Sequence, residues 1–223
     1  MMRKTLSQAG LWTLPVAGLL LLVGWLPLFF PGNNLRSTDP AAVARGFTNP
    51  TILATQDLYI IGMLCLLFGA VAIYGWLADV DGSRPWAAAG MVGGVSAMAL
   101  LIGIWTVLVL ADSILGDLYL AGHQGVADAF NSMSGGHWDR NRLLPFMFAI
   151  DLSGAVGVIG LTVALWRSRK VARWAAIMFG VAFALAVMAS PLSLIGAVLL
   201  MVSGFLIARN PAPQTAALRT AAG

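Results

Sequence analysis

Residues 143–165 read LLPFMFAIDLSGAVGVIGLTVAL, an apolar segment interrupted by a single acidic residue, Asp151. A hydrocarbon core about 30 Å thick is crossed by roughly 20 residues of α-helix, so this segment is long enough to span a membrane. A carboxylate at that depth costs about 3 kcal/mol on insertion scales, and such residues usually face protein or water. The segment therefore predicts a transmembrane helix in which Asp151 has a structural or functional role.

The rest of the chain has the composition of an integral membrane protein. Of its 223 residues, 59% are hydrophobic and 10% are charged, and the mean hydropathy is +0.86. Soluble domains contain about 25% charged residues, so this chain lies outside that class. The net charge of +4 does not indicate a nucleic-acid partner, because the basic residues are not clustered with aromatic side chains on a soluble face.

Six apolar segments predict an all-α fold, a polytopic transmembrane helical bundle of six spans that forms one domain over residues 1–209. The last two spans form a tight hairpin that turns at Ser190-Pro191, and residues 210–223 are predicted to be a disordered cytoplasmic tail. The predicted spans are about 11–30, 58–78, 87–111, 143–166, 172–189 and 191–208.

The basic residues predict the orientation of this bundle. Six spans put both termini on one side of the membrane, and that side holds nine of the 13 Lys and Arg residues. The positive-inside rule then places both termini in the cytoplasm, with the segment 167–173 as the strongest anchor. Because the first apolar segment is longer than a signal-peptide core, we expect it to be retained. The preference for Arg over Lys is typical of a GC-rich bacterial genome, so the predicted location is a bacterial cytoplasmic (inner) membrane.

Two Asx-Pro pairs predict helix starts on the other side of the membrane. Asp39-Pro40 and Asn49-Pro50 each combine an N-cap side chain with proline at the first helical position. The first pair predicts a short helix that ends near Phe47. The second predicts that the second transmembrane helix begins near Pro50, projects beyond the lipid and carries Gln56 and Asp57 at the surface.

Small residues recur at helical spacing in the third and fourth spans and predict close helix packing. We expect this packing to lie within one chain rather than at a dimer face. The residues are Gly90, Gly93, Gly94 and Ala97 in the third span, and Ala149, Ser153, Gly157, Gly160 and Ala164 in the fourth.

Several polar residues are predicted to converge on one outward-facing cavity. Buried carboxylates beside His or Arg can transfer protons or bind cations. Asp151 can instead be structural, bonding a neighbouring helix near Tyr59 or Thr106, or pairing with Arg140 or Arg142. The candidate catalytic residues are Asp151, Asp112 and Asp57, the candidate substrate-binding residues are Tyr59, His137, Arg140 and Arg142, and His123 lies in the same region.

No metal or cofactor is expected from the sequence. Cys65 is the only cysteine, so an intramolecular disulfide is excluded, and a small buried apolar residue is its expected role. The two histidines have no metal-ligand spacing, and neither lies in a span. Most tryptophans fall at predicted span ends, which is typical of an aromatic belt at the membrane surface.

The layout resembles a family of uncharacterised bacterial six-helix membrane proteins known only as a domain of unknown function. The resemblance covers about residues 8–208 and rests on Ala9-Gly10, on the Ala-rich segment 39–44 and on the segment 175–180 after a basic turn. It implies the six-helix fold and supplies no catalytic residues.

Three functional hypotheses remain open at this stage. The first is a transporter-like module or an accessory subunit of a membrane complex, and the second is a membrane-embedded enzyme that acts on a lipid or isoprenoid with Asp151 as general acid. The third is a purely structural subunit whose charges bond across an interface. The expected partners are the lipid bilayer and either another membrane protein or a second copy of the chain.

Overall fold

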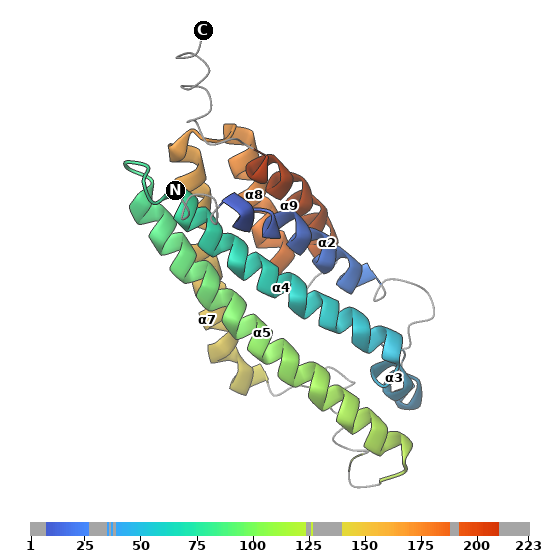
Figure 1. Ribbon diagram of the computed structural model, residues 1–223. Helices are drawn as coiled ribbons and strands as arrows, with labels where there is room; N and C mark the ends of the chain where they lie inside the picture. Colours follow the sequence, from blue (N-terminus) through green and yellow to red (C-terminus); the bar gives the residue numbers. More distant parts are fainter. Residues whose placement is uncertain are drawn as a thin grey trace.

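The computed structural model describes residues 8–26, 35, 37, 39–123, 126, 140–187 and 192–209, and only the backbone of 140–144 and 187. Every regular element in this part of the chain is a helix, so the predicted all-α fold is confirmed. Neighbouring helices run roughly antiparallel. Helix α9 packs on α2, and α8 packs on α9 and α7 (Figure 1). The helices are α2 (Thr13–Trp25), α3 (Pro40–Phe47), α4 (Pro50–Leu77), α5 (Arg84–Leu120), α7 (Arg140–Ser168), α8 (Arg173–Val187) and α9 (Leu192–Ala208).

Four helical segments in the described part are long and apolar enough to cross a membrane. They are Gln8–Trp25, Pro50–Leu77, Arg84–Leu120 and Pro145–Ser168. The apolar helices α8 and α9 are shorter, with 15 and 17 residues. The fold is therefore that of a membrane-embedded helical bundle.

Helix α5 is longer than the predicted span 87–111. Its 37 residues correspond to about 55 Å of helix, well beyond a hydrocarbon core of about 30 Å. After Pro85 in its first turn, the helix contains no proline, and it ends just before Gly122. Gly122 has a left-handed backbone with φ at 80°. Its N–H donates to the carbonyl oxygen of Tyr119, and the N–H of His123 donates to the carbonyl oxygen of Leu118. These two bonds form a Schellman C-cap.

The two predicted Asx-Pro helix starts are confirmed. The Asp39 carboxylate accepts hydrogen bonds from the backbone N–H groups of Ala41 and Ala42 at 3.1 and 3.2 Å. The Asn49 side chain accepts from the N–H of Thr51 at 2.9 Å and opens α4. Local side-chain chemistry therefore fixes where both α3 and α4 begin.

The most extensive packing in the bundle joins α5 to α7, and their glycines let the two backbones approach closely. A Cβ atom on Gly93 would lie 2.6 Å from the backbone nitrogen of Gly157 and the carbonyl oxygen of Ser153, and one on Gly157 would lie 2.6 Å from the nitrogen of Gly94. The small-residue faces predicted on these helices therefore do pack within one chain. Gly94 itself has more room, because a Cβ there would meet no side chain closer than 3.7 Å.

Aromatic residues mark two levels along the bundle. Trp86 lies near the start of α5 and Trp105 lies about 28 Å further along it, at about 1.5 Å per residue. That separation matches the thickness of a hydrocarbon core, and Trp and Tyr favour its two surfaces. We call the level of Trp105 the aromatic level. We call the level of Trp86 the basic end, because five basic residues lie there: Arg84, Arg167, Lys170, Arg173 and Arg209.

Lys170 anchors the basic end. Its Nζ atom donates a hydrogen bond of 2.7 Å to the carbonyl oxygen of Trp76 and lies 4.8 Å from the centre of that ring. A charged ammonium beside a tryptophan is suited to the boundary between lipid and water. The contact ties the turn after α7 to the end of α4.

Replacement of Gly157 by alanine tests the α5–α7 packing. We expect Gly157→Ala to lower the free energy of unfolding by about 1–3 kcal/mol, because the new methyl group would meet α5 backbone that has no room to move. Thermal unfolding in detergent measures the change. Gly103→Ala on α5 is the matched control, since a Cβ there meets nothing within 4 Å, and equal losses in both variants would contradict the packing argument.

Candidate functional site

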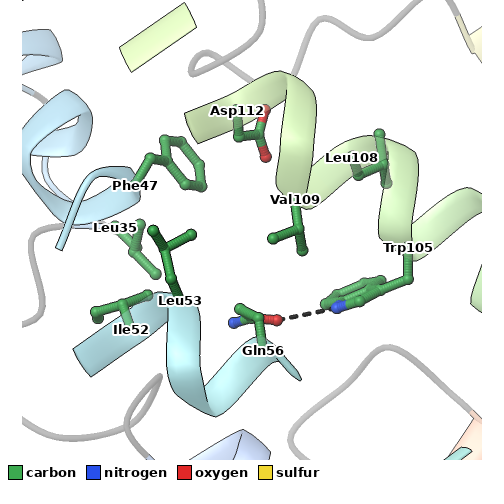
Figure 2. A pocket seen from close by; sticks show the side chains of 9 residues that line it. All are labelled: Leu35, Phe47, Ile52, Leu53, Gln56, Trp105, Leu108, Val109 and Asp112. Carbon is green, nitrogen blue, oxygen red and sulfur yellow. Dashed lines mark hydrogen bonds between the residues drawn. The ribbon is translucent and has the colours of Figure 1, made fainter. Parts of the chain in front are cut away.

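A cleft lies beyond the aromatic level, where α3, α4 and α5 meet. It has a volume of about 160 Å³. Figure 2 shows the Asp112 carboxyl at one end of this space and the Gln56 amide at the other, with apolar side chains between them. The cleft is lined by Leu35, Phe47, Ile52, Leu53, Gln56, Trp105, Leu108, Val109 and Asp112.

Helix α3 forms one wall of the cleft because it packs on the far end of α5. Val43 and Ala44 are buried against Leu115 and Tyr119 of α5. At Gly116 the two helices come close enough that a Cβ atom would lie 3.2 Å from the carbonyl oxygen of Ala44. This packing holds Phe47, the last residue of α3, over the space between α4 and α5 (Figure 2).

A hydrogen bond between α4 and α5 forms the inner end of the cleft. The indole N–H of Trp105 donates to Oε1 of Gln56 at 2.9 Å, and the Gln56 side chain is buried. Below this bond, the Trp105 ring lies 5.2 Å from Tyr59 and 6.3 Å from Trp25, measured between ring centres. The rings of α2, α4 and α5 therefore separate the cleft from the middle of the bundle.

Among the described residues, Asp112 is the one acidic residue that lines the cleft. It is half-buried, and within the described part of the chain it has no hydrogen-bond or ion-pair partner. It lies about 10 Å beyond Trp105 along α5, at about 1.5 Å per residue, and so outside a hydrocarbon core bounded by the aromatic level. A carboxylate there can meet water and a ligand together.

Two other predicted site residues lie near the cleft without lining it. Tyr59 is buried beneath Trp105 and belongs to the aromatic layer. Asp57 is exposed on α4, whereas the Gln56 side chain is buried between the helices. Consecutive helical residues point about 100° apart, so Gln56 turns toward α5 while Asp57 turns away from it.

Asp151 lies apart from this cleft. The expectation that it is buried against a partner near Tyr59 or Thr106 is wrong, because its side chain is exposed on α7. Thr106 donates its hydroxyl to the carbonyl of Ile102 in its own helix. The cause is the register of α7, whose glycines face α5 and thereby turn Asp151 to the opposite side.

The remaining predicted site residues fall at the margin of the described structure. His137 lies outside the described residues, and of Arg140 and Arg142 only the backbone is described. Arg142 and Asp151 are about 13 Å apart along the α7 axis, at about 1.5 Å per residue, so the helical geometry does not favour the suggested ion pair. His123 is exposed just after α5.

The described residues contain no group of three His, Cys, Asp or Glu side chains that is placed to hold a metal ion. Cys65 is a free cysteine and is half-buried on α4. The chemistry that the cleft offers is therefore one carboxyl, one amide and a large apolar surface. That combination suits binding, and it contains no second acid or base within the described part.

The sequence did not single out Phe47, Trp105 or Leu108 as site residues. Phe47 lies on α3 and the other two on α5, so only the packing of these two helices brings them together. The spacing of residues within one segment does not indicate that packing. The one available signal was the length of the apolar pattern, since α5 continues past the predicted span end into Asp112.

Comparison with known proteins adds no relative: no protein-family model, no curated protein and no solved structure matches this chain. The resemblance to an uncharacterised six-helix membrane family stays a prediction.

A double-mutant cycle tests the bond at the inner end of the cleft. Gln56→Leu should lower the free energy of unfolding by about 1–3 kcal/mol, because it leaves the Trp105 N–H without its acceptor. Adding Trp105→Phe removes that donor, so the double variant should lose less than the sum of the single variants. Thermal unfolding of the four proteins gives the coupling energy, and a coupling of zero would show that the bond does not stabilise the fold.

Proposed function

We propose that this chain is a six-span, transporter-like binding module of a bacterial inner membrane, and that its cleft binds the ammonium group of a small amphiphile. The observation that carries the proposal is the cleft itself. An unpaired carboxyl at one end, an amide at the other and apolar side chains between them match a ligand that is cationic at one end and apolar along its body.

The size of the cleft supports a compact ligand. An apolar protein cavity of about 150 Å³ accepts a benzene molecule, and this cleft has about 160 Å³. One ring, or a short alkyl segment, fills such a space. Phe47 and Leu108 supply apolar contacts, and the ring of Trp105 adds an aromatic face.

The location of the cleft supports recognition at the membrane surface. Asp112 lies beyond the aromatic level, where an amphiphile in the lipid carries its polar group. The ammonium group can then reach Asp112 while the apolar body stays near the lipid. Both a free amine and the headgroup of an aminophospholipid have this chemistry.

The register of the helices supports six crossings. A Cβ on Gly204 of α9 would lie 2.8 Å from Leu14 of α2, and one on Gly18 would lie 2.7 Å from the Ala197 carbonyl, so α9 runs antiparallel to α2. Continued at the same register, Leu192 at the start of α9 comes level with Trp25, at the aromatic level. Helix α9 thus covers the distance between the aromatic level and the basic end, which supports its crossing of the hydrocarbon core.

The enzyme alternative receives less support from the geometry. It needs Asp151 as general acid beside a bound substrate, but none of the described side chains of α7, Asp151 included, lines the cleft. A binding role needs only the side chains that line the cleft.

Binding of 4-fluorobenzylammonium tests the proposed ligand chemistry. Fluorine NMR of the protein in phosphatidylglycerol nanodiscs should detect binding, with benzyl alcohol and benzoate as much weaker competitors. Asp112→Asn should weaken binding about tenfold, since a buried contact between charges is lost. Asp117→Asn, an exposed carboxylate on the same helix, is the control.

The lipid in the nanodisc distinguishes the two ligand sources. If phosphatidylethanolamine displaces the fluorinated amine, the headgroup of an aminophospholipid is the ligand, and if it does not, a free amine is favoured. Equal competition by benzoate, or unchanged binding in Asp112→Asn, would refute the proposed site.

Reporter fusions test the topology. Fusions after Asn49 and Asn131 should report a periplasmic location and a fusion after Gly82 a cytoplasmic one, because the basic end retains the positive residues on the inner side. A periplasmic signal at Gly82 would reverse the assignment.

A further inference from the structure

The outer face of α7 carries a carboxylate among large apolar side chains. We define this face by Phe148, Asp151, Leu152, Ala155 and Ile159, all of which are exposed. Phe148 keeps 68% of its surface and Leu152 and Ile159 keep 57% each, so none of the described helices covers them. The opposite side of α7 packs on α5 through its glycines.

Asp151 lies at a depth where lipid would surround this face. A Cβ atom on Gly154 would lie 3.8 Å from the Cβ of Ala97, which aligns these two residues of α7 and α5. Asp151 is about one turn nearer the aromatic level than Gly154. At about 1.5 Å per residue, it lies about 7 Å on the hydrocarbon side of Trp105.

Lipid satisfies the apolar residues of this face but not Asp151. Hydrocarbon offers no hydrogen-bond donor, so an acidic side chain in a span generally pairs with another polar group. None of the described residues bonds the Asp151 carboxyl. The nearby hydroxyl of Ser153 donates to the carbonyl of Ala149 in its own helix.

We propose that the outer face of α7 docks a transmembrane helix of a different membrane protein, and that a Lys or Arg of that helix pairs with Asp151. The chemistry of the partner follows from charge complementarity with the single carboxylate. Ala155 lies about one turn from Asp151 on the same face, and a small side chain there lets a second helix approach closely.

A second copy of this chain fits the face less well. A symmetric dimer through this face would bring two Asp151 carboxylates to the same depth, where like charges repel. No basic residue of the described part lies at that depth. Arg45 lies on α3 beyond the aromatic level, and Arg84, Arg167, Arg169, Lys170, Arg173 and Arg209 lie at or near the basic end.

Association with a synthetic transmembrane helix tests this proposal. The probe is a dye-labelled Leu-Ala helix with one Lys about 7 Å inside the aromatic level, and the matched helix has Leu at that position. Energy transfer to the labelled full-length protein in phosphatidylcholine vesicles measures their binding. We expect the Lys helix to bind about tenfold more tightly than the Leu helix, which corresponds to about 1.4 kcal/mol.

Variants assign this difference to Asp151. Asp151→Leu and Asp151→Asn should reduce binding of the Lys helix to about that of the Leu helix, whereas Asp79→Leu, an exposed carboxylate at the basic end, should not. Unchanged thermal unfolding of the Asp151 variants would show that the fold is intact.

Two results would overturn the proposal. One is equal binding of the Lys and Leu helices to the wild-type protein. The other is energy transfer between two labelled copies of the chain that disappears in Asp151→Leu, because that result would make the face a homodimer contact.

Discussion

The backbone contact between α5 and α7 is the constraint on which the rest of this structure depends. In a bilayer, burying one apolar side chain against another gains little, because lipid is equally apolar, and helices associate where their backbones can approach. Gly93 and Gly157 allow that approach. Once these glycines face α5, the rotation of α7 about its axis is fixed. Asp151 must then lie on the outer face.

The cleft depends on the length of α4 and α5. Both helices continue beyond the aromatic level, so their ends can carry groups that lipid would not tolerate. Helix α3 packs on this extension of α5 and closes one side of the space between the two helices. The result is a site whose walls are apolar, as in the membrane, but whose acid, Asp112, is within reach of water.

The bundle separates its two conspicuous acids and gives each a different environment. Asp112 lies in a cleft that no described side chain of α7 lines, and Asp151 lies on a surface that the described helices leave open. The first environment suits the proposed small cationic ligand, because a cavity adjoins the carboxyl. The second suits the proposed partner helix, because the surface is long and apolar. The two environments share none of the described residues.

The sequence by itself determined the features that depend on local chemistry or on composition. Hydropathy predicted the long apolar helices, the side chains of Asp39 and Asn49 predicted the starts of α3 and α4, and the small-residue pattern predicted close packing of α5 on α7. These features depend on groups a few residues apart, or on the solvent that a whole segment requires.

The direction in which each polar side chain faces follows from the tertiary packing. The sequence analysis favoured an interior position for Asp151, which is exposed, and it did not indicate that Gln56 is buried while Asp57 is exposed. An apolar helix in a membrane is apolar on all sides, so hydropathy does not distinguish its lipid face from its protein face. That distinction comes from helix rotation, which is set by where the glycines of one helix meet the backbone of the next.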